Sequence, residues 1–184
     1  MEMVYYGIFA VFKPWTSMGM GMSTEIRKMM RLAAANEEEV DAFIEWLKKR
    51  DLSSGRLDRK LKRSLNRAMS ELDCTRCARC CKEAYVVLQD GDIGRLADRL
   101  GMRRSDFRAQ YVTRNEDGDV CLNRRPCPFL KKNLCTLYED RPDCCREYPQ
   151  SLASESADNL DNLGANYLVC PAVYDALERL RDFI

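Results

Sequence analysis

Four cysteines fall within eight residues in the segment CTRCARCC, at positions 74 to 81. Thiols at such short spacing are typical of metal and iron–sulfur ligands. The chain carries ten cysteines in 184 residues and no histidine. The absence of imidazole excludes histidine-bearing zinc sites and Ser-His or Cys-His catalytic pairs. A metal ion would therefore be bound by thiolates, with carboxylates or backbone groups as the alternatives.

The cysteine spacing favours iron over zinc. The C-x2-C-x2-C arrangement of Cys74, Cys77 and Cys80, followed by a distant Cys-Pro pair, is typical of loops that bind a [4Fe-4S] cluster. In both such pairs, Cys127-Pro128 and Cys170-Pro171, we expect the proline to open a helix and the cysteine to cap it. A zinc ribbon would need a second C-x2-C downstream, which is absent. We therefore favour a [4Fe-4S] cluster or another iron centre, with Zn2+ as the alternative.

The neighbours Cys80 and Cys81 are expected to serve different sites, because adjacent side chains tend to diverge. Disulfides within the cluster would close small, strained rings. The N-terminal segment lacks the features of an export signal, so we expect a cytoplasmic protein. Its apolar run, residues 4–12, is too short to span a membrane, which takes about 20 residues.

The elements that must position these cysteines are mostly helical. Apolar spacing predicts two amphipathic helices, or one broken helix, within 24–50, with Asn36 as an N-cap. It also predicts a third helix over 56–72 and short helices near 90–100 and 105–112. A last helix is expected over 172–183 and a short strand over 85–89. The predicted fold is mainly α, a small helical domain with long irregular cysteine-rich metal-binding loops. Because the loops over 113–170 have few apolar stripes, we expect the fold to depend on its metal.

Composition divides the chain into three parts. Residues 1–22 form an uncertain leader, in which Met18, Met20 or Met22 could be the initiator. Residues 23–72 hold the N-terminal amphipathic helices, and 73–184 form the cysteine-cluster metal-binding domain.

The nearly balanced charge of the chain does not favour binding to polyanions. Thirty basic and 29 acidic residues leave a net charge of +1, so nucleic acid is not the expected partner. The basic face of the third helix is interpreted as a solvated surface. We expect the partner to be another protein, either a redox partner or a maturation client. Near Cys144 and Cys145, Arg141 and Arg146 neutralise thiolates, contact an anionic substrate, or pair with Glu139 or Glu147.

Five ordered blocks of the sequence resemble the CxxCxxCC cysteine-cluster family. The blocks are CTRCARCC at 74–81, CPFL at 127–130, CTLYEDRP at 135–142, CREYP at 145–149 and CP at 170–171. The family is described as a zinc- or iron-chelating domain, and flagellin lysine N-methylases carry a similar one. The resemblance covers about residues 72–173. It implies as metal ligands Cys74, Cys77, Cys80, Cys81, Cys127, Cys135, Cys145 and Cys170, with Cys121 and Cys144 as possible additional ones.

Eight thiols exceed one four-coordinate site. Two sites, two metals with bridging thiolates, and cysteines that lie near a metal without binding it all remain open. The favoured function is metal chelation with a redox, sensing or protein-maturation role. One alternative is an enzyme similar to protein lysine N-methyltransferases, although no G-x-G-x-x-G motif follows a predicted strand. The other is a structural zinc module that mediates protein or nucleic-acid interaction. The sequence assigns no catalytic residue.

Overall fold

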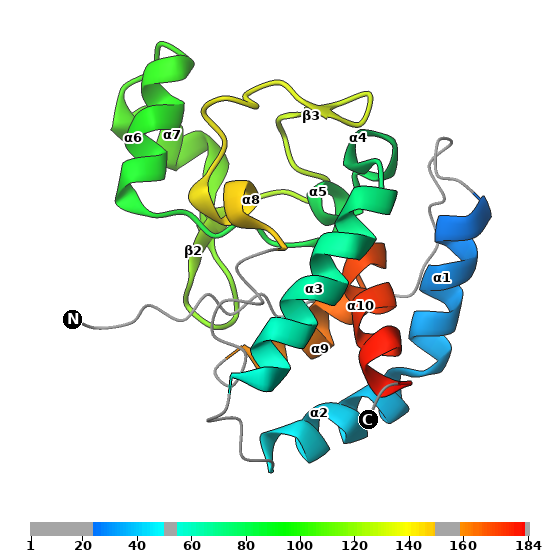
Figure 1. Ribbon diagram of the computed structural model, residues 1–184. Coiled ribbons are helices and arrows are strands. Elements are labelled where there is room, and N and C mark those ends of the chain that lie inside the picture. Colours follow the sequence, from blue (N-terminus) through cyan, green and yellow to red (C-terminus); the bar gives the residue numbers. More distant parts are fainter. Residues whose placement is uncertain (1–23, 50–54, 150–158, 183–184) are drawn as a thin grey trace. The chain divides into compact units, whose positions relative to one another are not determined.

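The computed structural model describes residues 24–49, 55–149 and 159–182. The predicted leader, with its apolar run and its methionines, lies outside these ranges. Helices predominate in the described residues, and strands occur there only in small two-stranded sheets (Figure 1). The predicted mainly α fold class is therefore confirmed. None of the described helices is long and apolar enough to cross a membrane.

The described residues form two compact units. One comprises residues 78–148, and the other comprises 24–77 together with 149–182, apart from the gaps given above. The boundary falls between Cys77 and Ala78, inside the first cysteine segment. Ala78 has a left-handed backbone with φ of 50° and separates two short helices, α4 (Cys74–Cys77) and α5 (Arg79–Glu83). A left-handed conformation is unfavourable for alanine.

The discontinuous unit is a helical assembly. Besides α4, it contains α1 (Thr24–Ala35), α2 (Glu37–Lys48), α3 (Arg56–Glu71), α9 (Leu160–Tyr167) and α10 (Pro171–Arg181). Helix α10 packs against α1, α3 and α9, and α2 packs against α9. Helices α3 and α10 each carry buried leucines at helical spacing, Leu61 and Leu65 on α3 and Leu177 and Leu180 on α10.

Asn36 is the N-cap of α2, as its spacing to Glu39 predicts, but its side chain makes no capping hydrogen bond. It hydrogen-bonds the hydroxyl of Tyr167 instead. That hydroxyl also donates to Glu178 Oε1 at 2.9 Å, and Tyr167 is fully buried. A tertiary partner has thus replaced the local one, because a buried hydroxyl needs hydrogen-bond partners.

The continuous unit combines short helices with two hairpins. In addition to α5, it contains α6 (Asp90–Arg99), α7 (Arg104–Tyr111), β1 (Val112–Arg114), β2 (Val120–Leu122), β3 (Leu130–Lys131), β4 (Leu134–Cys135) and α8 (Asp143–Glu147). Strands β1 and β2 pair antiparallel, as do β3 and β4. The strand predicted over 85–89 is reduced to one bridge, between Val87 and Cys121.

This unit has a hydrophobic core of its own. Its buried members are Val86, Leu88, Ile93, Leu96, Ala97, Phe107, Leu122, Phe129 and Leu137. The Tyr111 ring contacts both Phe107 and Phe129, with centroids 5.1 and 5.2 Å away. Because Phe129 and Leu137 belong to the segment predicted to lack apolar anchors, the cysteine-bearing loops are held by packing as well as by any metal. Cys127, Cys135, Cys144 and Cys145 pack against this core.

Candidate metal centre

The predicted ligands are divided between the two units. Cys74, Cys77 and Cys170 belong to the discontinuous unit, whereas Cys80, Cys81, Cys127, Cys135 and Cys145 belong to the continuous one, as do Cys121 and Cys144. The ten cysteines all lie in the described residues, and none of them forms a disulfide there. Seven of the ten cysteines thus lie in the continuous unit, where backbone and electrostatic contacts bring some of their thiols together.

Backbone hydrogen bonds connect three of the cysteine-bearing segments. The amide of Cys127 donates to the carbonyl oxygen of Cys81 at 2.8 Å, which joins the CPFL segment to α5. The carbonyl of Cys127 accepts from the amide of Leu130 at 3.0 Å, and Leu130 pairs with Cys135 across β3 and β4. Cys81, Cys127 and Cys135 are thus brought together by main-chain contacts.

Electrostatic interactions add a fourth thiol to this group. Burial, with smaller contributions from the Cys145, Cys81 and Cys135 thiolates, raises the pKa of Cys127 to about 12. Burial likewise raises the pKa of Cys135, with Cys81 and Cys145 contributing. A hydrogen bond with Cys144 and burial raise the pKa of Cys145, to which Cys144 and Cys81 also contribute. Cys81, Cys127, Cys135 and Cys145, the thiol quartet, are thus near enough to disfavour one another's ionisation.

Two members of the quartet accept hydrogen bonds from nearby backbone amides. The amide of Phe129 donates to the sulfur of Cys127, and the amide of Leu137 donates to the sulfur of Cys135. Both bonds lower the pKa of the thiol that accepts them, because they stabilise the thiolate. In each case the donor follows the cysteine by two residues, so the CPF and CTL segments form equivalent turns.

The adjacent cysteine pairs differ in their surroundings. The sulfurs of Cys80 and Cys81 are 4.0 Å apart, and a hydrogen bond from Cys80 lowers the pKa of Cys81 to about 7. The sulfurs of Cys144 and Cys145 are 3.9 Å apart. The thiol of Cys144 donates to the carbonyl oxygen of Val87 at 3.1 Å, whereas Cys145 interacts with the other three thiols of the quartet. That Cys80 and Cys81 serve different sites remains a prediction.

The quartet fits a thiophilic ion in its donor chemistry. Thiolates bind zinc and iron in proteins, and a cation relieves the repulsion that raises these pKa values. The side chains are not gathered into a coordination shell: within the described ranges, no group of three or more Cys, Asp or Glu residues has the arrangement of a metal site.

The two Cys-Pro pairs adopt different structures. Cys170 is the N-cap of α10 and Pro171 is its first residue, as predicted. Cys127-Pro128 begins a turn that leads into β3, so the prediction of a helix cap there is wrong. The turn is closed by the Leu130 amide, and the Phe129 amide supplies the donor to sulfur that a helix would have supplied.

The arginines near Cys144 and Cys145 bind mainly backbone carbonyls. Arg141 donates to the Tyr138 carbonyl at 2.6 Å and lies 3.8 Å above the Tyr138 ring. Its charge partly offsets the rise in the pKa of Cys135, which is the direction that the predicted neutralising role requires. Arg146 donates to the carbonyl of Glu139 at 3.0 Å rather than to its carboxylate, and its ion pair is with Asp143.

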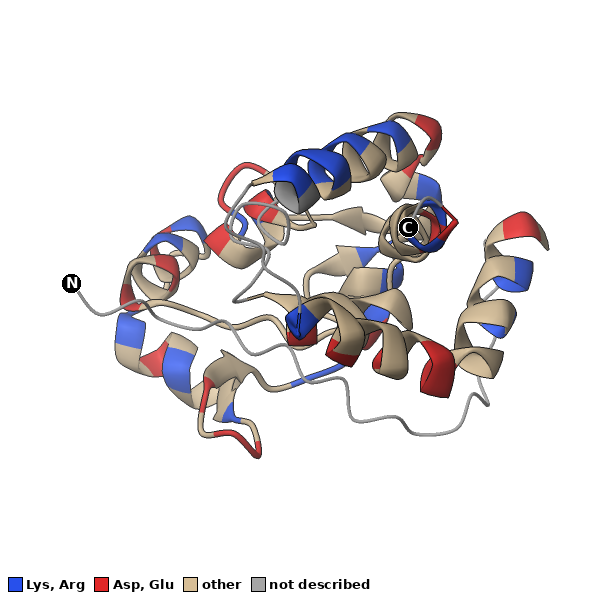
Figure 2. Cartoon of the chain, turned by 60° about the horizontal axis from the view of Figure 1, so that its bottom comes forward, with Lys and Arg blue, Asp and Glu red and all other residues tan. Residues whose placement is uncertain are grey.

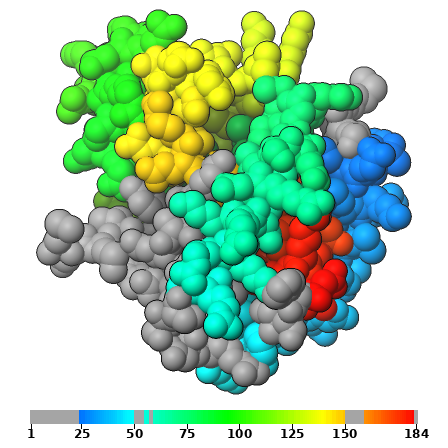
Figure 3. Space-filling model, viewed as in Figure 1, coloured from blue at the N-terminus to red at the C-terminus, as the bar shows by residue number. Residues whose placement is uncertain are grey.

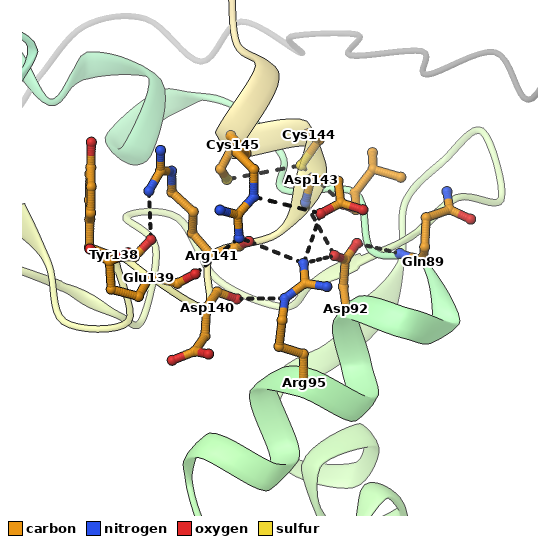
Figure 4. Close-up of polar contacts among 12 residues, drawn as sticks. Gln89, Asp92, Arg95, Tyr138, Glu139, Asp140, Arg141, Asp143, Cys144 and Cys145 are labelled. Atoms are coloured by element: carbon orange, nitrogen blue, oxygen red, sulfur yellow. Dashed lines mark hydrogen bonds and ion pairs between the residues drawn. The ribbon is translucent and has the colours of Figure 1, made fainter.

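Sequence reasoning missed the polar network beneath α8 (Figure 4). Asp92 and Arg95 of α6 contact the segment that precedes Cys144 and Cys145. Asp92 and Asp143 lie 51 positions apart in the sequence, so no local residue pattern could have predicted the network.

A family comparison agrees with this geometry. Residues 73–171 match the family model named CxxCxxCC, whose printed description is "Putative zinc- or iron-chelating domain". Searches of curated proteins and of solved structures gave no match. The matched region includes the whole thiol quartet and covers more than half of the chain. The chain therefore belongs to the CxxCxxCC family of zinc- or iron-chelating cysteine-cluster domains.

Proposed function

We propose that the chain chelates iron or zinc through the thiol quartet and serves a redox, sensing or protein-maturation role with a partner protein. The observation that carries the proposal is the convergence of Cys81, Cys127, Cys135 and Cys145 within one compact unit. An iron–sulfur cluster or another iron centre is the favoured occupant, with Zn2+ as the alternative. Iron would supply one-electron chemistry to the site.

The physical support lies in how the quartet would respond to a cation. In the metal-free chain, burial and mutual repulsion keep three of the four thiols protonated at neutral pH. A bound cation favours the thiolates, so binding would release protons and would be weaker at low pH. The amide donors to Cys127 and Cys135 would stabilise the negatively charged sulfurs of either a cluster or a single ion.

The deciding experiment measures iron, zinc and acid-labile sulfide in protein purified without oxygen and without chelator, together with its visible absorption spectrum. Iron with matching sulfide would support a cluster, iron without sulfide a thiolate-bound iron centre, and zinc without sulfide a structural role. Metal-free protein that also fails to bind added Fe2+, Zn2+ or Co2+ would refute the proposal. The other predicted ligands stay candidates, and more than one metal centre per chain would support them: Cys74, Cys77, Cys80 and Cys170.

A second candidate function comes from the outward face of α3. Five cations follow one another at helical spacing on the side opposite buried Leu61 and Leu65: Arg56, Arg59, Lys60, Arg63 and Arg67. Figure 2 shows basic residues recurring along this helix, and Figure 3 shows its side chains lying against those of α10. Burial and the charges of Arg63 and Arg56 lower the pKa of Lys60.

Such a stripe would bind an acidic protein surface. We expect immobilised poly-glutamate to retain the wild-type chain at low salt and to release it as salt rises and screens the charges. The double variant Arg59→Glu/Arg63→Glu should not be retained. Absence of retention of the wild-type chain would contradict this candidate, and retention by single-stranded DNA alone would favour nucleic acid instead.

A further inference from the structure

Asp92 of α6 is a carboxylate with 1% of its surface exposed. Burying a carboxylate is unfavourable unless its oxygens are paired and hydrogen-bonded. Here Oδ2 accepts from the amide of Gln89 at 2.9 Å, and Oδ1 accepts from Arg95 Nη2 at 2.6 Å and from the amide of Asp143 at 3.1 Å. The carboxylate therefore connects the start of α6 to the first residue of α8.

Arg95 extends this connection along the chain. Its Nε donates to the carbonyl of Asp140 at 3.3 Å, and its Nη2 donates to the carbonyl of Arg141 at 3.2 Å and to Asp143 Oδ1 at 2.9 Å. A planar guanidinium can satisfy several acceptors in fixed directions, which an ammonium group cannot. One side chain of α6 therefore holds the backbone and a carboxylate of the segment that directly precedes Cys144 and Cys145 (Figure 4).

Besides this hold, helix α8 is attached by the hydrogen bond of Cys144 to the Val87 carbonyl and by the packing of Cys144 and Cys145 against the core. It contains five residues, none of them fully buried. The carbonyl of Pro142 accepts from the amides of Cys145 and Arg146 at 2.9 and 3.0 Å, which sets the first turn. Fixing residues 140–143 through Asp92 and Arg95 therefore also fixes the direction in which the Cys145 side chain leaves the helix.

We propose that Asp92, together with Arg95, is the positioning pair that places the Cys145 sulfur for metal binding. The proposal rests on the proposed function of the thiol quartet. Neither residue is itself a ligand. They determine whether the fourth thiolate reaches the site, in the way that outer-shell partners orient ligands elsewhere.

The test is a titration of the reduced, metal-free full chain with Co2+, followed by the absorption of the Co2+–thiolate bonds. We expect Asp92→Asn to weaken Co2+ binding by about 10- to 100-fold and to reduce the thiolate absorption, as is typical for outer-shell changes. Arg95→Lys keeps the charge and leaves the bonds of Asp92 to Gln89 and Asp143 intact, so it should fold even if Asp92→Asn does not, and it should weaken binding in the same direction. Asp90→Asn is the matched control, because Asp90 lies on the same helix as Asp92 and its ion pair, with Arg108 of α7, is exposed.

A double variant separates positioning from general support of the fold. If Asp92 acts through Cys145, then Asp92→Asn/Cys145→Ser binds Co2+ no more weakly than Cys145→Ser alone. Additive losses in the double variant would overturn the proposal. So would an Asp92→Asn variant whose Co2+ affinity stays within about twofold of wild type, against the expected outer-shell loss. Where Asp92→Asn is unfolded, the same criterion applies to Arg95→Lys. A wild-type chain that contains no iron or zinc and binds no Co2+ would instead refute the proposed function.

Discussion

The amide of Cys127 donates a 2.8 Å hydrogen bond to the carbonyl oxygen of Cys81, which links the first cysteine segment to the CPFL segment through the backbone. Because this link uses no side-chain sulfur, it leaves both thiols available to a metal. It also places the two segments side by side before any metal is bound. The quartet is therefore partly organised by the fold, and its fourth member, Cys145, is carried by the short helix α8.

The adjacent residues Cys144 and Cys145 should respond differently to substitution by serine. Cys145→Ser removes a member of the quartet, so we expect Co2+ affinity to fall by more than the roughly 10- to 100-fold typical of outer-shell changes. Cys144→Ser should retain near wild-type affinity, because a serine hydroxyl can also donate to the Val87 carbonyl. Equal losses in the two variants would show that the quartet is wrongly composed.

The pKa values predict an order of alkylation in the reduced, metal-free chain. The thiolate is the reactive form, so at pH 8 about nine-tenths of Cys81 but only about one Cys127 thiol in ten thousand should be reactive. Labelling of Cys81 by iodoacetamide should therefore fall as the pH is lowered from 8 to 6, while Cys127 stays unlabelled throughout. Peptide mass spectrometry measures both sites, and unfolded protein, in which all cysteines should react alike, is the control. Equal rates at the two cysteines in the folded chain would contradict the assignment.

Long amphipathic elements could be predicted from the sequence because their apolar spacing is repeated. Leu61 and Leu65 identify α3, and Val173, Leu177 and Leu180 identify α10 with its Cys170 cap. Helix α9 was missed, although Leu160, Leu163 and Tyr167 are buried at helical spacing. Its eight residues offer about two turns, too few for periodicity alone to establish a helix.

The ligands could be predicted as residue types, but their grouping could not. The cysteine spacing and the family resemblance named all four members of the quartet. A long-range backbone contact brings Cys81 and Cys127 together. Cys135 lies in β4, which, like its partner β3, has two residues, too few to show the alternation of a strand. The Asp92 and Arg95 contacts link α6 to a distant segment, and no local pattern records such a pairing.

The buried hydroxyl of Tyr167 should contribute measurably to stability. Tyr167→Phe keeps the ring but removes the hydrogen bonds with Glu178 and Asn36. We expect the free energy of unfolding in urea to fall by about 1.5 to 3 kcal/mol, the range for hydrogen bonds that involve a charged group. Tyr174→Phe is the matched control, because its ring contacts that of Tyr167 while its hydroxyl has no hydrogen bond to a described residue. An equal loss in both variants would assign the effect to ring packing.

Removal of the metal should loosen the segment around α8 without unfolding the core of its unit. Leu96, Ala97 and Phe107 are fully buried and need no metal to pack, whereas α8 has no fully buried residue. If the free metal concentration is about 100 times the dissociation constant, removing the metal lowers the free energy of opening by about 2.7 kcal/mol wherever opening breaks the site. This corresponds to about a hundredfold faster exchange. Hydrogen exchange followed by mass spectrometry should therefore show that the amides of Cys145 and Arg146 exchange about a hundredfold faster after chelation, while those of α6 and α7 keep their protection. Uniform loss of protection across both regions would mean that the core itself depends on the metal, as the sequence alone suggested. Unchanged exchange at α8 would mean that Cys145 does not bind the metal.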